Sequence, residues 1–208
     1  MMSRDHYPRF LISSALAALL SVAACGGDEP RASTPDAAAP TADADVDAPP
    51  VITGEDLDMR AEDFTCIKTW DMVRHFRISN KLGHLDEALA VANAPQGKTY
   101  PVGTIIQLVP FEAMVKRGKG FSAESNDWEF FALTVNAQGT TINARGGDST
   151  VLNQFNRRPC LECHSPAKAA YDFVCDEETQ QHGCMPLGVP IDIILRAQNG
   201  DARCPPQP

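Results

Sequence analysis

The stretch Trp128–Val135, WEFFALTV, is rich in aromatic and β-branched residues and predicts a β-strand. Because side chains alternate along a strand, Trp128, Phe130 and Ala132 lie on one face and Phe131 and Leu133 on the other. The residues that follow, 136–139, have the composition of a hairpin turn and lead into a second expected strand over residues 140–144.

Further strand and helix patterns lie on both sides of this hairpin. Tyr100–Val109 is dense in β-formers and predicts another strand. The spacing of apolar residues predicts helices over Asp63–Asn80, His84–Ala94 and Ile191–Gln198. Strands between helical regions indicate an α+β fold, a small antiparallel β-sheet with flanking helices.

A basic segment, Lys116–Gly120, connects two of the expected strands. Its glycines and its charge indicate a solvated hairpin loop. The alternative is that its three cations face a ligand.

The segment Cys160–His164, CLECH, has two thiols three residues apart and an imidazole directly after the second. This is the spacing of a c-type haem attachment site. Residues i and i+3 share a helix face, so both sulfurs can meet the vinyl groups at one haem edge. His164 can then place a ring nitrogen on the iron. We predict one covalent haem c, bound by Cys160, Cys163 and His164.

Half of a zinc site and a redox Cys-x-x-Cys motif are the alternatives. A structural zinc site usually has a second Cys or His pair, and a thioredoxin-type motif lies in a βαβ pattern. The later thiols Cys175, Cys184 and Cys204 do not form a second Cys-x-x-Cys. Haem attachment also requires export, because the thioether bonds are made outside the cytoplasm.

Residues 1–24 predict export. Arg4 and Arg9 precede an apolar run, Phe10–Ala24, that has the length of a signal-peptide core rather than of a membrane span. The end of this run, Val22–Gly26, resembles a bacterial lipobox, which implies cleavage before Cys25 and a lipid on its thiol. An ordinary signal-peptidase site is the alternative. A glycine rather than an aspartate after the cysteine indicates the outer membrane, so we expect a lipid-anchored protein of the bacterial cell envelope that faces the periplasm.

Residues 25–54 have the composition of a disordered acidic tether. Ala, Asp, Pro and Thr dominate, and such a segment cannot bury enough surface to offset its ordering entropy. A docking tail for a basic partner is the alternative reading. The net charge of −9 argues against a nucleic-acid partner. The folded domain is expected over residues 55–208, long enough for a single core.

Four of the seven cysteines remain after lipidation and haem attachment. An even number of thiols in an oxidising compartment predicts two disulfides, and a four-thiol metal site is the alternative. Cys175 and Cys184 flank a short polar loop, so we expect them to pair, which leaves Cys66 with Cys204.

Four motifs in this order resemble the cytochrome P-460 family over about residues 60–185: Tyr100–Ile106 (YPVGTII), Asn126–Phe131 (NDWEFF), Cys160–His164 and Tyr171–Val174 (YDFV). The resemblance implies a cytochrome P-460-like fold, one c-type haem and an open sixth iron position. Some members oxidise hydroxylamine with a lysine crosslinked to the haem. Others, the cytochromes c′-beta, bind nitric oxide without that bond.

The crosslinking lysine is expected to be absent here. In the crosslinked members it follows the Gly-Thr strand, and counting forward from Gly103 and Thr104 places Leu108 at that position. The nearest lysines are Lys98 and Lys116. The resemblance therefore argues against hydroxylamine oxidation.

A low-spin electron carrier needs a second axial ligand, usually Met or His. Met185, beside Cys184, is one candidate, although Met is more often core filler. We interpret the other Met and His residues as packing, exposed or hydrogen-bonded side chains: Met72, Met114, His75, His84 and His182.

The apolar strands instead indicate a dry distal face, which favours small neutral ligands such as NO and CO. Glu129 could supply a proton there, or Arg117 a positive charge. The sequence does not give the strand register, so it selects neither residue. We therefore expect a monohaem c-type cytochrome with a five-coordinate haem that binds or redox-processes a small nitrogen-oxide ligand and meets a redox partner cytochrome. Three alternatives remain: a six-coordinate periplasmic electron carrier, a hydroxylamine-oxidising enzyme, and a haem-free structural lipoprotein.

Overall fold

The computed structural model describes residues 52–175, 184, 186 and 188–205. The expected signal peptide, Cys25 and nearly all of the expected tether lie outside these residues, as do His182 and Met185. No helix of the described ranges is both long enough and apolar enough to span a bilayer.

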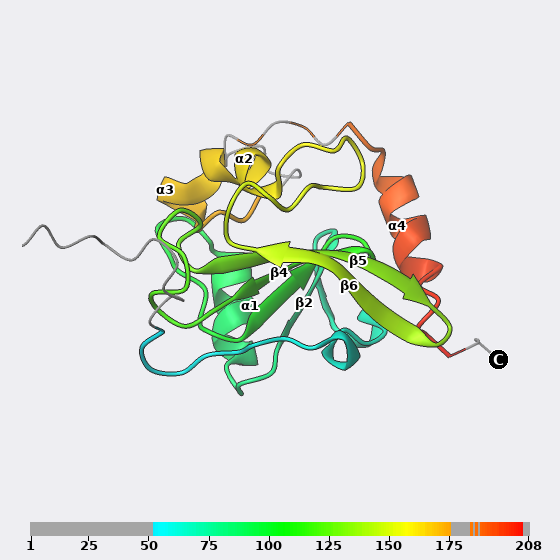
Figure 1. The fold of residues 1–208 in the computed structure, drawn as a ribbon, viewed down its shortest axis with the longest axis horizontal. Helices are drawn as coiled ribbons and strands as arrows, with labels where there is room; N and C mark the ends of the chain where they lie inside the picture. The colour runs from blue at the N-terminus through cyan, green and yellow to red at the C-terminus, as the bar shows by residue number, and fades with distance from the viewer. Residues whose placement is uncertain (1–51, 176–183, 185, 187, 206–208) are drawn as a thin grey trace, which may run out of the picture. The chain divides into compact units, whose positions relative to one another are not determined.

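One antiparallel sheet of six strands forms the centre of the described chain, with the strands side by side in sequence order (Figure 1). The strands are β1 (Asp71–Val73), β2 (Phe76–Asn80), β3 (Thr104–Gln107), β4 (Glu112–Lys116), β5 (Trp128–Asn136) and β6 (Gly139–Gly146). The predicted antiparallel sheet and the hairpin after residue 135 are confirmed.

Strand β5 separates two hydrophobic clusters, as its alternation predicts. Trp128 and Phe130 belong to the cluster that also contains Met114 and the first thiol of the CLECH segment. Phe131 belongs to the cluster on the opposite face, which includes Met59 and Phe64 from the segment before β1. The sheet is therefore covered on both faces.

The helices are α1 (Leu85–Asn93), α2 (Cys160–His164), α3 (Lys168–Tyr171) and α4 (Ile191–Asn199), with single 3₁₀ turns η1 (Ala61–Asp63), η2 (Ile67–Thr69) and η3 (Ser165–Ala167). The helices expected at 84–94 and 191–198 are confirmed. In Figure 1, α2 and α3 lie above the sheet on the left, and α4 lies on the right, near the tip of the β5–β6 hairpin. Together with the sheet these elements give an α+β fold.

The helix predicted over Asp63–Asn80 is wrong. This region forms η1, η2 and the β1–β2 hairpin, with Val73 opposite Phe76 and Arg74 in the left-handed conformation of a tight turn. The i, i+3 spacing of Val73 and Phe76 fits a helix, but it fits a two-residue turn equally well. In β2, Phe76 and Ile78 are buried and Arg77 between them is half-buried, which fits the strand period.

The interpretation of Lys116–Gly120 as a solvated loop is also wrong for its first two residues. Lys116 is 4% exposed and Arg117 is 6% exposed. Lys116 pairs with Asp172, and Arg117 pairs with Asp56 and Glu129. The carboxylates come from distant parts of the chain, so the local sequence gives no sign that these charges are neutralised.

Both predicted disulfides are present. Cys66 is bonded to Cys204, and Cys175 is bonded to Cys184. The first joins the segment before β1 to the end of α4, and the second closes a loop of nine residues directly after the chain leaves α3.

Candidate functional site

Helix α2 presents the CLECH segment to the apolar face of the sheet. The chain after β6 forms a folded loop in which the backbone of Cys160 donates to the carbonyl of Val151 at 2.9 Å. In the same loop, the side chain of Asn153 accepts hydrogen bonds from the backbone nitrogens of Phe155 and Asn156. Pro159 precedes the helix with an extended ψ, which suits the residue before a first turn. The position of α2 is therefore set by its own connecting loop.

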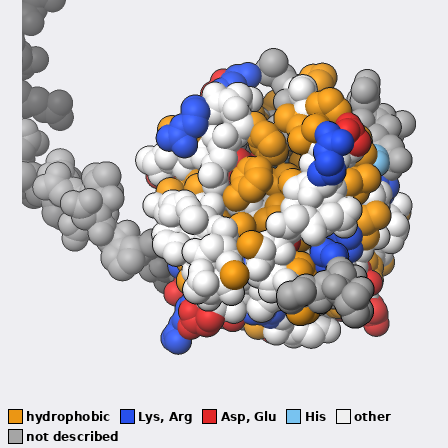
Figure 2. Space-filling view, turned by 90° about the vertical axis from the view of Figure 1, so that its right-hand side faces the viewer, with side chains coloured by type: hydrophobic (Ala, Val, Ile, Leu, Met, Phe, Trp, Pro, Cys, Tyr) orange, Lys and Arg blue, Asp and Glu red, His pale blue; other side chains and the backbone are white. Residues whose placement is uncertain are grey.

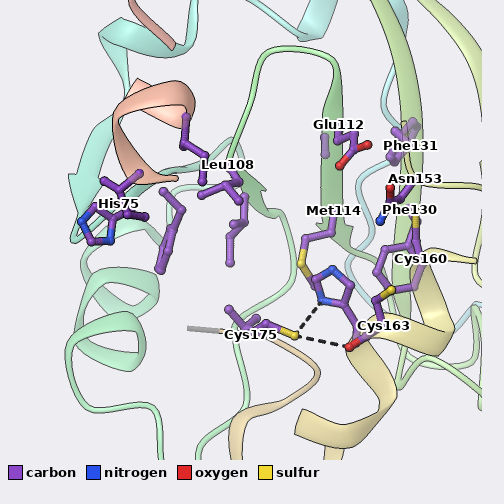
Figure 3. Close-up of a pocket in the computed structure, with 17 residues that line it drawn as sticks. His75, Leu108, Glu112, Met114, Phe130, Phe131, Asn153, Cys160, Cys163 and Cys175 are labelled. Carbon is purple, nitrogen blue, oxygen red and sulfur yellow. Dashed lines mark hydrogen bonds between the residues drawn. The ribbon is translucent and has the colours of Figure 1, made fainter. Parts of the chain in front are cut away.

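All three predicted haem-binding residues line one pocket. Cys160 and Cys163 lie beside Met114 and Phe130 of the sheet, across the pocket from His75 and Leu108 (Figure 3). The remaining apolar lining comes mainly from Phe76, Ile106, Leu108, Met114, Phe130, Val174, Ile191 and Ile194. The empty space of the pocket is about 1090 Å³ when the part open to solvent is included.

Helix α4 is fixed over this pocket by one buried amide. The side-chain nitrogen of Gln198 donates to the carbonyl oxygens of His75 at 2.6 Å and Leu108 at 2.9 Å, and its oxygen accepts from Arg77. Seen from the α4 side, the surface carries a central group of hydrophobic side chains with Lys and Arg side chains around it (Figure 2).

The two motif thiols are unpaired and protonated. Cys160 is buried and Cys163 is half-buried, and neither is in a disulfide. Burial raises the pKa of Cys160 to about 12, with a further contribution from the nearby Glu112, and burial also raises the pKa of Cys163. A redox Cys-x-x-Cys motif has the opposite property, a lowered thiol pKa.

A zinc site at this motif also lacks support. Within the described residues, the one cluster of potential metal ligands is Cys66, Asp201 and Cys204, and both of its sulfurs are in a disulfide. A structural zinc ion needs four ligands. The pair Cys160 and Cys163 has no such second pair beside it in the part of the chain that is described.

The ring of His164 is held in one orientation. Its Nδ1 donates a hydrogen bond of 2.7 Å to the carbonyl oxygen of Phe173, and the ring packs on Phe130 with centroids 5.2 Å apart. The sulfur of Cys175 lies 3.8 Å from the same nitrogen (Figure 3). Because a carbonyl oxygen only accepts, Nδ1 carries the proton, and in the neutral ring the lone pair is on Nε2. A metal-binding histidine usually has this arrangement.

Glu112 and Asn153 are polar residues of the pocket lining that the sequence analysis missed. Burial raises the pKa of the Glu112 carboxyl group. The hydrogen bond that this carboxylate accepts from the backbone of Gln154 acts in the opposite direction and lowers the pKa. A sequence signal exists, because Glu112 precedes Met114 by two positions and so shares its strand face. Glu112 is the one Asp or Glu side chain in the described lining, and it is therefore the candidate proton donor.

The other candidates take different places. Leu108 lines the pocket, and the described lining contains no lysine. Glu129 and Arg117 lie outside it and pair with each other. His84 pairs with Glu55 near the surface.

Two side chains interpreted as ordinary packing or exposed residues, Met114 and His75, do line the pocket. Met72, expected to pack, is 51% exposed. His182 and Met185 lie outside the described residues.

No protein-family model, no curated protein and no solved structure matches this chain. Functional assignment therefore depends on the chemistry of the pocket itself.

Proposed function

We propose that Cys160, Cys163 and His164 bind one haem c, and that the protein is a monohaem c-type cytochrome that binds or redox-processes a small nitrogen-oxide ligand. The observation that carries the proposal is that both thiols and the imidazole line one pocket whose other side chains are mainly apolar. A residue pattern for attachment and a cavity for the attached group thus occur at the same place.

The residues present fit this group. Both thiols are unpaired, and burial favours their protonated form, so each could add to a vinyl group, with the sulfur bonding one carbon and its hydrogen going to the other. Nδ1 of His164 is occupied by the carbonyl of Phe173, so Nε2 is the nitrogen that would hold the iron. When bound, the haem supplies an iron that takes up diatomic ligands and changes oxidation state.

The rest of the pocket supports ligand binding at an open iron. Phe76, Ile106 and Leu108 provide an apolar surface that excludes water and favours small neutral molecules. Glu112 provides one carboxyl group whose protonated form is favoured by burial. Leu108 stands where the crosslinked members of the cytochrome P-460 family have a lysine, which favours ligand binding over hydroxylamine oxidation.

The proposal also includes a cytochrome P-460-like fold and a location outside the cytoplasm. The antiparallel sheet followed by the CLECH segment agrees with a cytochrome P-460-like architecture. The two disulfides support export to an oxidising compartment, where haem c is attached. We propose a lipid anchor at Cys25 in the bacterial outer membrane, with the cytochrome domain facing the periplasm.

A second candidate function, electron transfer, is favoured by one observation. Met114 and His75 both line the pocket, and either residue type can be a sixth ligand. An iron with two protein ligands would exchange electrons without binding NO.

The test is production of the full chain with the c-type maturation machinery, followed by haem staining on a denaturing gel and absorption spectra with and without NO. We expect a stained band, a ferrous spectrum without a sharp low-spin α-band, and a spectral change with NO. Cys160→Ala/Cys163→Ala should lose the stain, while the matched control Cys66→Ser/Cys204→Ser should keep it per molecule of folded protein. A sharp α-band unaffected by NO would identify the electron carrier, and a colourless chain would rule out a cytochrome.

A further inference from the structure

A buried ion pair between Lys116 and Asp172 lies next to the turn whose carbonyl oxygen accepts a hydrogen bond from His164. The ammonium group of Lys116 is 2.9 Å and 3.0 Å from the two carboxylate oxygens of Asp172, and the two side chains are 5% and 1% exposed. The same carboxylate accepts a hydrogen bond from the backbone nitrogen of Tyr100 at 2.8 Å and from the side chain of Asn126 at 2.6 Å. Four hydrogen bonds from three donor groups, each in a separate segment, therefore fix one carboxylate.

The backbone at Asp172 is as tightly held as its side chain. The indole nitrogen of Trp128 donates to the carbonyl oxygen of Asp172 at 2.7 Å. Asp172 and Phe173 both have left-handed backbone conformations, with φ of 47° and 64°. A helix commonly ends with one left-handed residue, usually glycine, so a second one on a buried Phe is unusual. Such backbone is maintained only where its surroundings over-determine it.

This turn delivers the carbonyl oxygen of Phe173 to His164. The peptide group that follows the two left-handed residues carries the oxygen that accepts from Nδ1 at 2.7 Å. Asp172 thus does not line the pocket, yet its contacts hold the backbone whose next carbonyl accepts from the ring.

We infer that Lys116 and Asp172 are positioning residues for the iron ligand: through the turn at 172–173 they hold the Phe173 carbonyl against Nδ1 of His164 and so set the donor strength of Nε2. This inference rests on the proposed function, since it gives His164 a metal to bind. A stronger hydrogen bond to Nδ1 makes the imidazole more basic and stabilises the oxidised metal.

The test compares three variants of the full chain. Asp172→Ala removes both the carboxylate and the tolerance of aspartate for left-handed backbone. Lys116→Gln/Asp172→Asn keeps that tolerance and charge balance but loses the ion pair, so it remains useful if the alanine variant does not fold. Asp201→Asn is the matched control, because Asp201 is also a buried carboxylate that pairs with an arginine and accepts a backbone N–H, outside the pocket.

The readouts are the reduction potential and the iron–histidine stretching frequency of the haem-loaded protein, together with thermal stability. We expect both variants at position 172 to raise the potential and lower the stretching frequency, with the alanine variant shifted further. Asp201→Asn should lose stability without either spectroscopic change. Equal behaviour of the variants at positions 172 and 201, with stability alone affected, would overturn the inference.

Failure of the proposed function would be recognised separately. If the wild-type chain carries no haem, the ring nitrogen shifts of His164 in that haem-free chain decide the inference. The wild-type ring is expected to be protonated at Nδ1, and Asp172→Ala should move the proton to Nε2. A wild-type ring protonated at Nε2 would overturn the inference whatever the protein binds.

Discussion

The backbone nitrogen of Ile67 donates a hydrogen bond of 2.9 Å to Asp201, beside the disulfide that joins Cys66 to Cys204. Two segments 138 residues apart in sequence are thus fixed together by one covalent bond and one buried carboxylate. This connection joins the start of the described fold to the end of α4, the helix that covers the pocket.

We expect Cys66→Ser/Cys204→Ser to lower the free energy of unfolding by about 5 kcal/mol, because the disulfide closes a long loop in the unfolded chain. Cys175→Ser/Cys184→Ser, which opens a loop of only nine residues, should cost about 2.5 kcal/mol by the same loop-entropy relation. Chemical denaturation of the two variants and the wild type measures both values. Equal losses would show that chain entropy is not the origin of the effect.

Gly103 is expected to tolerate no side chain. Its φ is +83°, and a β-carbon there would lie 2.6 Å from Cγ of Leu82. Gly103→Ala should therefore cost about 2–4 kcal/mol, from left-handed strain and overpacking together. Gly83→Ala is the control, because Gly83 has a similar φ of +92° but nothing within 4 Å of the added atom. The midpoint temperature of thermal unfolding should be much lower for Gly103→Ala than for Gly83→Ala. The reverse order would contradict the packing argument.

Glu112 makes the stability of the protein depend on pH. Burial raises the pKa of its carboxyl group above that of the unfolded chain, so the folded state binds the proton more tightly. The wild type should then lose stability as pH rises from the unfolded pKa through the folded pKa. Glu112→Gln keeps an oxygen acceptor for the backbone of Gln154 and removes the charge, so its advantage over the wild type should grow across that window.

The measurement is the free energy of unfolding of both proteins between about pH 4 and pH 8, spanning the ordinary glutamate range and the region above it. Glu124→Gln, at an exposed position outside the pocket, is the control. A constant difference between Glu112→Gln and the wild type at all pH values would show that the carboxyl group is not responsible.

The elements that the sequence predicted well are those with local signals. Strand β5 was predicted because its two-residue alternation extends over Trp128–Val135, and α4 because Pro190 precedes it and Gly200 ends it. The β1–β2 hairpin was missed because a turn at Arg74 and a helix place apolar residues at the same spacing. Period alone does not distinguish the two over so short a range.

In the candidate site too, features with a local sequence pattern could be predicted, and features that depend on long-range contacts could not. The spacing of Cys160, Cys163 and His164 is a local pattern, and the structure brings all three to one pocket. The hydrogen-bond partner of His164 is a backbone carbonyl, which has no residue type to recognise in a sequence. The local sequence predicts a solvated loop cation at Lys116, because its partner, Asp172, lies 56 residues away. Such contacts follow from the fold and not from neighbouring residues.

The second buried ion network, on the opposite side of the sheet from the pocket, gives the last prediction. Arg117 pairs with Asp56 and Glu129, and Arg145 pairs with the same glutamate at 2.5 Å. Arg117→Met should cost about 3 kcal/mol, because the partly buried Asp56 loses its arginine while the buried Glu129 keeps only Arg145. Arg196→Met, which breaks the exposed pair with Asp192, should cost at most about 0.5 kcal/mol. Since Arg117 does not line the pocket, its variant should lower the unfolding midpoint while haem stain per folded protein stays at the wild-type level. A loss of haem stain at unchanged stability would instead link this network to the pocket.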